Sequence, residues 1–527
     1  MSEHGNQQDP ARRRFWATAI VAAVIALVVT IAVTALLVTI FERQREAEEP
    51  FFRVVQIDED TEDPAIWGQN WPLHYDSHMR TVEMEPTRHG GSEAVPRTPD
   101  ERDPRSEVPR SRLEADPRLE ILYAGYAFSV DTREERGHAY MLDDATYTRR
   151  QEVAQQRGYC LHCHSSVYTT YRDLGDGDIR EGFLELNPMP YEEAREHVEH
   201  PVTCIDCHDP DTMDLRVTRP AFIQGIANYK ASQGIDDYDV NRDATRQEMR
   251  SFACAQCHAT YYFQEETREL IFPWSQGVRA NEILAHYELT GFAHWTHEDT
   301  GAEMLKVQHP EYEMFEQGIH GQVGVSCADC HMPYEREGAM KVSDHHVRSP
   351  LLNIARSCQT CHNEPEEELR QRVHTIQDRN FELNNLSIDA VANLIQEITV
   401  FKEEGASDEE LEEAREHHRK AQFYADFVES ANSMGFHSPQ ESARVATLAI
   451  NHARRGQMAL RDDASDELLT QVRAQLREIE PLPFRAGPDD VEPPPMEAPE
   501  PADEEPEPEE TPEPEDEDDA ENGANDS

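Results

Sequence analysis

No cysteine stands alone in this sequence. All ten cysteines occur in five C-x-x-C pairs, at positions 160/163, 204/207, 254/257, 327/330 and 358/361. No thiol is left over for a further disulfide or for a lone cysteine nucleophile. The chemistry of these cysteines must therefore be one that uses two thiols three positions apart.

Basic residues are scarce as well. The 527 residues include 49 lysines and arginines against 105 acids, for a formal net charge of −56, and no base follows Arg485. Binding to nucleic-acid phosphates needs a basic face. The composition therefore excludes a general nucleic-acid surface and indicates a strongly hydrated, acidic one.

Charge is absent from residues 15–40, which read FWATAIVAAVIALVVTIAVTALLVTI. This stretch is long enough to cross a bilayer as a helix, whereas the apolar part of a signal peptide has roughly 7–15 residues. A cleaved signal peptide is the competing interpretation, with only a weak site, VTA, near the end. We predict an uncleaved anchor. The arginines at 12–14 then leave residues 1–14 in the cytoplasm and the bulk of the chain on the periplasmic side of the cell membrane, as a single-pass protein.

The rest of the chain divides by composition. Residues 86–112 are rich in Pro, Arg, Gly and Ser, which predicts an irregular excursion, and one folded domain is expected over residues 50–482. From 486 to 527 proline alternates with acid, and large apolar residues are almost absent. Such a tail cannot bury enough surface to offset the entropy of ordering, so we predict that it is disordered.

The section after Cys361 has the pattern of long helices. Its apolar residues recur at helical spacing, and we expect them to face a packed bundle; they are Ile388, Val391, Ile395 and Ile398. The sequence SDEE at 407–410 has the form of a capping box that opens the next helix. SMGF at 433–436 interrupts that helix, and a further helix is expected from about residue 440.

Each cysteine pair is followed directly by a histidine, at His164, His208, His258, His331 and His362. Two thiols at this spacing add to the two vinyl groups of one haem, and the adjacent imidazole binds its iron. A single copy could also be half of a zinc site, a redox dithiol or a chance match. Zinc sites do not require a histidine after every pair, so five copies predict five covalently bound c-type haems. The expected fold is mainly α, a multihaem cytochrome c fold with haems in the core, long C-terminal helices and little β-sheet.

Several stretches of the chain then carry a family resemblance: WPLHYDS (71–77), DPRLEILYAGYAFSVD (116–131), RGHAYMLDD (136–144), VTCIDCHDPDTMDLRVTRPA (202–221), CAQCHATYYF (254–263), GFAHWTH (291–297), MLKVQHPEYE (304–313), GIHG (318–321), VSCADCHMP (325–333) and SDHH (343–346). In this order, over roughly residues 50 to 460, the sequence resembles the pentahaem, ammonia-forming cytochrome c nitrite reductases.

The resemblance implies further haem ligands. Four haems of this family have two axial histidines, and the matching distal residues are His345 for the second haem, His138 for the third, His437 for the fourth and His320 for the fifth. His346 is a rival for His345. The first haem is expected to keep an open distal face.

The residues that match the lining of that open face are Arg150, Tyr261 and His309, with Arg149 as a rival for the arginine. The implied activity is the six-electron reduction of nitrite to ammonium, with side activity on hydroxylamine or sulfite. The alternative is a multihaem electron-transfer protein without substrate chemistry, but such a carrier has no need of these three residues. The implied partners are nitrite, a quinol-oxidising or cytochrome electron donor in the membrane, and a second copy of the chain, held through the C-terminal helices.

Two positions depart from the family pattern. His164 stands where the family usually has a proximal lysine, and an imidazole is a competent ligand there. Thr260 stands where the family has a glutamate that binds calcium, although the other calcium positions, Tyr261, Lys306 and Gln308, are retained. Because calcium favours carboxylate oxygens, we expect a weak or empty calcium site.

Overall fold

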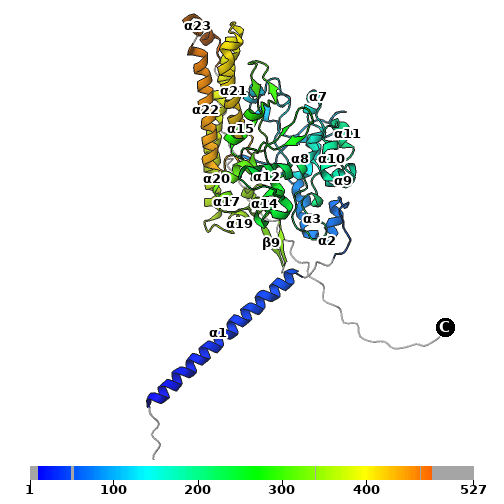
Figure 1. Ribbon diagram of the computed structural model, residues 1–527, viewed down its shortest axis with the longest axis vertical. Coiled ribbons are helices and arrows are strands. Elements are labelled where there is room, and N and C mark those ends of the chain that lie inside the picture. The colour runs from blue at the N-terminus through cyan, green and yellow to red at the C-terminus, as the bar shows by residue number, and fades with distance from the viewer. Residues whose placement is uncertain (1–9, 49–52, 339, 463, 478–527) are drawn as a thin grey trace, which may run out of the picture.

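The computed structural model describes residues 10–48, 53–338, 340–462 and 464–477. The predicted tail at 486–527 and residues 1–9 of the predicted cytoplasmic segment lie outside these ranges. Within them the chain is mainly helical, as predicted, and Figure 1 shows the order of the helices by colour.

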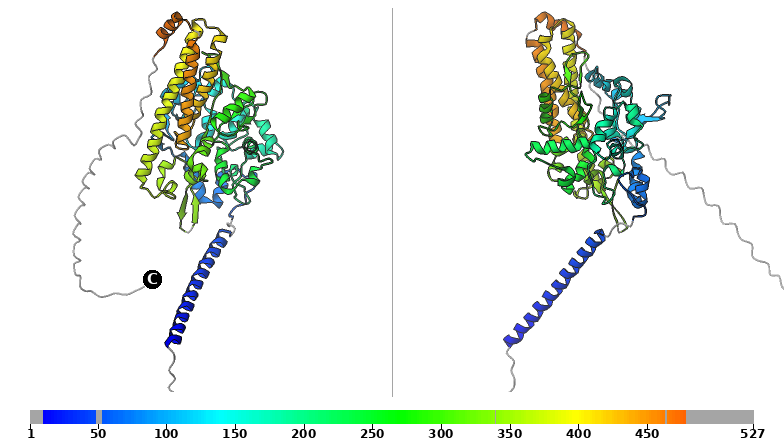
Figure 2. Two further views of the ribbon diagram at one scale, coloured as in Figure 1. Left: turned by 60° about the vertical axis from the view of Figure 1, so that its left-hand side comes forward. Right: turned by 45° about the vertical axis from the view of Figure 1, so that its right-hand side comes forward.

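The C-terminal part forms the predicted long helices, which are α20 (Glu366–Glu403), α21 (Asp408–Glu429), α22 (Pro439–Asp462) and the shorter α23 (Asp466–Gln475). Helices α20, α21 and α22 pack against one another along their lengths and lie side by side in Figures 1 and 2. The predicted break at 433–436 falls in the connection between α21 and α22.

Two local signals explain this bundle. The apolar stripe of α20 is buried, with Ile388 2% exposed and Val391 fully buried. Helix α21 begins with the predicted capping box, in which the Ser407 N–H donates to Glu410 Oε2 at 2.7 Å and the Ser407 side chain accepts from the Glu410 N–H. Burial of an apolar face stabilises a helix more than its intrinsic propensity does, so the stripe fixes the packing and the box fixes the start.

Between residue 53 and the bundle the helices are short. They are α2 (Pro64–Asn70), α3 (Pro72–Met79), α4 (Arg112–Ala115), α5 (Arg118–Leu122), α6 (Met141–Thr146), α7 (Arg150–Ala154), α8 (Leu161–His164), α9 (Tyr168–Leu174), α10 (Ile179–Leu186), α11 (Tyr191–Arg195), α12 (Pro220–Ser232), α13 (Val240–Asp243), α14 (Arg246–Ala255), α15 (Ala280–Thr290), α16 (Glu311–Gln317), α17 (Ile319–Gln322), α18 (Cys327–His331) and α19 (Ile354–Ser357). Short 3-10 turns join them: η1 (Arg80–Val82), η2 (Ala127–Ser129), η3 (His138–Tyr140), η4 (Gly158–Cys160), η5 (Cys204–Asp206) and η6 (Pro350–Leu352).

The little sheet in the described residues consists of two-stranded antiparallel pairs. These are β1 (Pro86–Thr87) with β2 (Gly90–Gly91), β3 (Ala94–Pro96) with β4 (Glu107–Pro109), β5 (Tyr262–Phe263) with β6 (Leu270–Ile271), β7 (Trp295–Thr296) with β8 (Glu303–Met304) and β9 (Tyr334–Glu337) with β10 (Met340–Ser343). The expectation of an irregular segment at 86–112 therefore needs correction, because two of these pairs lie within it.

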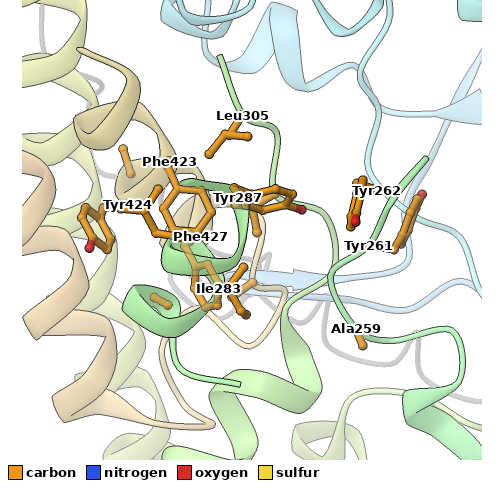
Figure 3. Packing of buried hydrophobic residues seen from close by; sticks show 14 of the residues in the cluster. Ala259, Tyr261, Tyr262, Ile283, Tyr287, Leu305, Phe423, Tyr424 and Phe427 are labelled. Atoms are coloured by element: carbon orange, nitrogen blue, oxygen red, sulfur yellow. The ribbon is translucent and has the colours of Figure 1, made fainter. Parts of the chain in front are cut away.

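A buried aromatic cluster joins the bundle to the motif-bearing part of the chain (Figure 3). Phe423 of α21 packs on Tyr287 of α15, with 6.2 Å between the ring centres, and Tyr287 packs on Tyr262 at 5.4 Å. Tyr261, next along the chain, is also buried and lies at the end of this cluster in Figure 3. The long helices thus support the backbone that carries Tyr261.

The N-terminal helix α1 spans Pro10–Glu48 and contains the uncharged stretch. Its segment Thr18–Val38 has a mean hydropathy of 3.0 and is not buried against the rest of the protein. By length and composition this helix can cross a membrane, and it also has the position of a signal sequence.

Candidate haem and substrate site

One continuous cavity of about 2970 Å³ occupies the motif-bearing part of the protein. This is about three times the upper end of the usual range for a ligand pocket, ~300–1,000 Å³. All ten cysteines line it, as do the five motif histidines and the four predicted distal histidines. Its size and lining fit several large cofactors attached through thiols.

The five motifs reach the cavity from separate elements. The first motif spans η4 and α8, and the second begins in η5. The third begins in the last turn of α14 and continues past its end. The fourth forms α18, and the fifth follows α19. The ten thiols are free, with no disulfide within any pair. Two unpaired thiols beside one imidazole are what covalent attachment of a c-type haem requires.

The structure pairs each of the four predicted distal histidines with a different motif histidine. The distances between ring centres are 6.2 Å for His208 and His345, 6.3 Å for His258 and His138, 6.4 Å for His331 and His437, and 6.3 Å for His362 and His320. An iron that lies about 2 Å from one nitrogen of each ring separates two ring centres by roughly 6 Å. These four pairs therefore have the spacing of axial ligands on either side of a haem iron.

Backbone carbonyls orient several of these rings. The Nδ1–H of His164 donates to the Met141 carbonyl at 3.2 Å, and that of His208 donates to the Met213 carbonyl at 3.0 Å. Such a bond leaves Nε2 free to bind a metal. Burial lowers the pKa of His164 to about 4, so the ring is neutral near pH 7, as metal binding requires.

The rival position beside His345 is also resolved by geometry. The Nε2 of His346 lies 4.0 Å from a carboxylate oxygen of Glu83, and its ring is 2% exposed. His345, in contrast, lines the cavity and faces His208. The structure thus brings His345, and not His346, to the second motif.

The first motif has a different environment. The four predicted distal histidines each face another motif, and the ionisable neighbours of His164 are His309, Arg150 and Glu135. After burial, His309 and Arg150 lower the pKa of His164, whereas Glu135 raises it. Arg150 lines the cavity from the start of α7, and its Nε donates to Thr148 Oγ1 at 3.1 Å. Arg149 is exposed. The arginine at the cavity is therefore Arg150.

The run DDATYTRR, which ends at Arg150, does not form one continuous helix. Helix α6 ends at Thr146, and Arg150 begins the separate helix α7. The break lies at Thr148, whose hydroxyl donates to Asp131 at 2.9 Å and also accepts from the Arg150 N–H at 3.3 Å. This interruption aims the Arg150 side chain at the first motif.

His309 and Tyr261 complete the polar lining near His164. The Nδ1 of His309 lies 3.1 Å from a carboxylate oxygen of Glu135. Tyr261 donates its hydroxyl hydrogen to Gln308 Oε1 at 3.1 Å. Burial raises the pKa of Tyr261 well above its ordinary value, so the phenol stays protonated. The predicted residues Arg150, Tyr261 and His309 thus share one region of the cavity.

Thiols of the first, third and fourth motifs lie close together. The pKa of the Cys163 thiol is raised, chiefly by its hydrogen bond with the Cys257 thiol, and that of Cys327 is lowered, chiefly by its hydrogen bond with Cys254. The first, third and fourth motifs are therefore in contact in that order. The second motif contacts the third, because Nε2 of Gln256 in the third motif lies 3.7 Å from Sγ of Cys207 in the second.

The side chains at the retained calcium positions already have hydrogen-bond partners within the protein. Gln308 Oε1 already accepts from Tyr261, and the Thr260 hydroxyl accepts from the Gln308 N–H at 3.4 Å. The Lys306 ammonium is buried and paired with Asp426 at 2.7 Å. With no carboxylate at position 260, these residues fit calcium poorly, and no role for calcium follows from them.

Two residues that sequence reasoning missed are Glu135, which contacts His309, and Phe128, which lies under Arg150. Glu135 lies outside the stretches that carry the family resemblance, and Phe128 lies in one of them, at 116–131, without a role assigned to it. No local pattern signals these contacts, because folding alone brings the paired segments together.

A helical fold around one cavity lined by five thiol pairs defines a multihaem c-type cytochrome. A model of the family described as cytochrome c552 matches residues 63–514. The cytochrome c-552 of Parabacteroides distasonis is 38% identical over 348 residues, covering 65% of this chain and 67% of that protein. The cytochrome c-552 of Bacteroides fragilis is 35% identical over 402 residues, covering 75% and 76%.

This chain belongs to the cytochrome c552 family. Among solved structures, the catalytic subunit of cytochrome c nitrite reductase from Desulfovibrio desulfuricans, described with two calcium sites, matches with a TM-score of 0.68 and 26% identity, over 79% of this chain and 90% of that chain. The predictions of the family, of the multihaem fold and of an oxidoreductase are therefore confirmed.

Proposed function

We propose that this chain is a membrane-anchored pentahaem cytochrome that reduces nitrite to ammonium at the first haem. The observation that carries the proposal is the contrast between motifs. Four motif histidines each face a second histidine at 6.2–6.4 Å. His164 instead lies near Arg150 and His309. A substrate site requires such polar side chains, whereas an electron carrier does not need them.

In this proposal the five cysteine pairs hold five haems, and His164 is the proximal ligand of the first, in the place of the family's lysine. When bound, the haems store and pass electrons, and the first offers a coordination position to nitrite. The contacts among the first, third and fourth motifs support a continuous electron path to this site. Six electrons can then reach one nitrite without release of an intermediate.

The chain's own residues hold the anion and supply protons. The guanidinium of Arg150 can donate hydrogen bonds to the oxygens of nitrite as the N–O bonds break. His309 is the proposed proton donor, since an imidazole exchanges protons near neutral pH. Tyr261 keeps its hydroxyl hydrogen because of burial and adds a polar contact. Together they give an acidic protein a local site for an anion.

The direct test is an assay of the purified, haem-loaded protein with a reduced viologen dye as donor. We expect about one ammonium formed, and about six electrons consumed, for each nitrite lost, as the proposed reaction requires. Hydroxylamine and sulfite, the side substrates, are assayed in parallel. Nitrite that stays unreduced while the haems are oxidised by other acceptors would favour the electron-transfer function instead.

We propose that α1 stays in the membrane with residues 1–14 in the cytoplasm, so that the catalytic domain lies on the periplasmic side beside a quinol-oxidising or cytochrome donor. The uncharged segment Thr18–Val38 supports this placement. We also propose a homodimer through the long helices, where Leu386 of α20 is 58% exposed and Met458 of α22 is 60% exposed. Apolar side chains at such exposure on packed helices suit a second copy of the chain.

A further inference from the structure

His309 has a backbone conformation that is uncommon for a residue with a side chain. Its φ is 48°, in the left-handed region. A conformation of this kind persists where the surrounding contacts hold it, and such positions gather at functional sites. The contacts that hold His309 therefore bear on the position of its ring in the cavity.

Those contacts form a closed ring of three hydrogen bonds and one contact between a carboxylate and an imidazole. The Glu311 N–H donates to the His309 carbonyl at 2.8 Å, and the Asn432 N–H donates to Glu311 Oε1 at 3.0 Å. The Asn432 side chain donates to Glu135 Oε2 at 3.0 Å, and Glu135 Oε1 lies 3.1 Å from His309 Nδ1. This series of contacts thus begins at the His309 carbonyl and ends at the His309 imidazole.

Three distant parts of the chain meet in this ring. Glu135 precedes η3, Glu311 begins α16, and Asn432 follows α21 in the bundle. Each of the two carboxylate oxygens of Glu135 has its own partner, so the carboxylate is held in one orientation. A carboxylate beside Nδ1 of an imidazole favours the orientation and the tautomer in which Nδ1 carries the hydrogen, and this leaves Nε2 for chemistry.

From this geometry we propose that Glu135 is the positioning residue for His309, holding the imidazole so that Nε2 serves the substrate at the first motif. The inference rests on the proposed function, which gives His309 the role of proton donor. Glu135 acts only through His309, with Asn432 keeping its carboxylate in place.

The test is a double-mutant cycle on the haem-loaded protein with Glu135→Ala, His309→Ala and the double variant. We expect Glu135→Ala to lower kcat for nitrite roughly 10- to 100-fold, the usual loss when a supporting partner is removed, with little change in KM. In the His309→Ala background the same change should have no further effect, because the two residues act as one unit. An equal loss in both backgrounds, or none in the wild-type background, would overturn the inference.

Matched variants separate positioning from other effects. Glu135→Gln keeps an oxygen acceptor of the same reach and should retain more activity than Glu135→Ala. Glu134→Ala removes a negative charge one residue away, outside the hydrogen-bonded ring, and should leave kcat unchanged. If Glu135→Gln is as slow as Glu135→Ala, or Glu134→Ala is equally slow, the positioning role is wrong.

A crystal structure of the haem-loaded Glu135→Ala protein gives a readout apart from activity. We expect the His309 ring to be rotated or spread over several positions, with its neighbours unchanged. A ring in the wild-type position would overturn the inference even if nitrite reduction were slow. A wild-type protein that does not reduce nitrite would refute the proposed function, while the position of the ring would still decide the role of Glu135.

Discussion

The guanidinium of Arg150 lies 4.5 Å from the centre of the Phe128 ring. The Lys306 ammonium lies 5.3 Å from the same ring, and Tyr126 stacks on it with 5.3 Å between centres. Phe128 is therefore held by its own neighbours and provides a fixed aromatic face for the arginine that we expect to bind nitrite.

Replacing Phe128 with leucine should weaken the binding of nitrite. A contact between a cation and an aromatic face contributes about 0.5–2 kcal/mol, which corresponds to a roughly 2- to 30-fold rise in KM. Phe128→Tyr keeps the aromatic face and should stay near the wild-type value. Steady-state kinetics of the three proteins decide the point, and a KM for Phe128→Leu equal to that of wild type would contradict it.

Arg150→Ala and His309→Ala should each lose most ammonium formation while all five haems stay attached. Removing one preorganised donor from a site of this kind typically costs about 100- to 1,000-fold in rate. The measurement pairs the initial rate with the haem content per chain. Arg149→Ala is the matched control, because that side chain is exposed and should be dispensable.

The sequence predicted the parts of the site that have local signals. Thiol spacing predicted the five cysteine pairs that line the cavity, the apolar stripe from Ile388 predicted α20, and the SDEE capping box predicted the start of α21. It could not predict the contact of Glu135 with His309 or of Phe128 with Arg150. Those contacts depend on how segments far apart in the sequence pack against each other. The sequence around one residue of each pair therefore carries no sign of its partner.

Removal of calcium should leave activity almost unchanged. The reason is that Thr260 offers no carboxylate and the side-chain oxygen of Gln308 is already bonded to Tyr261. The experiment is extensive chelation followed by metal analysis and the nitrite assay. Stoichiometric calcium that is lost together with activity would show that another group completes the site.

Protein made in native membranes should need detergent for release, because in the proposed topology the uncharged segment of α1 spans the bilayer. Sequencing of the mature N-terminus should find the start of the chain intact. A mature protein that begins near Leu36 would instead identify the segment as a cleaved signal peptide.

The central claim is that the first haem alone is open to substrate, with His164 as its proximal ligand. Electron paramagnetic resonance and optical spectra of the oxidised, haem-loaded protein, recorded before and after addition of nitrite, test it most directly. We predict one high-spin haem whose signal changes with nitrite and four low-spin haems that do not respond. Five low-spin, six-coordinate haems that ignore nitrite would contradict the account and identify the protein as an electron carrier.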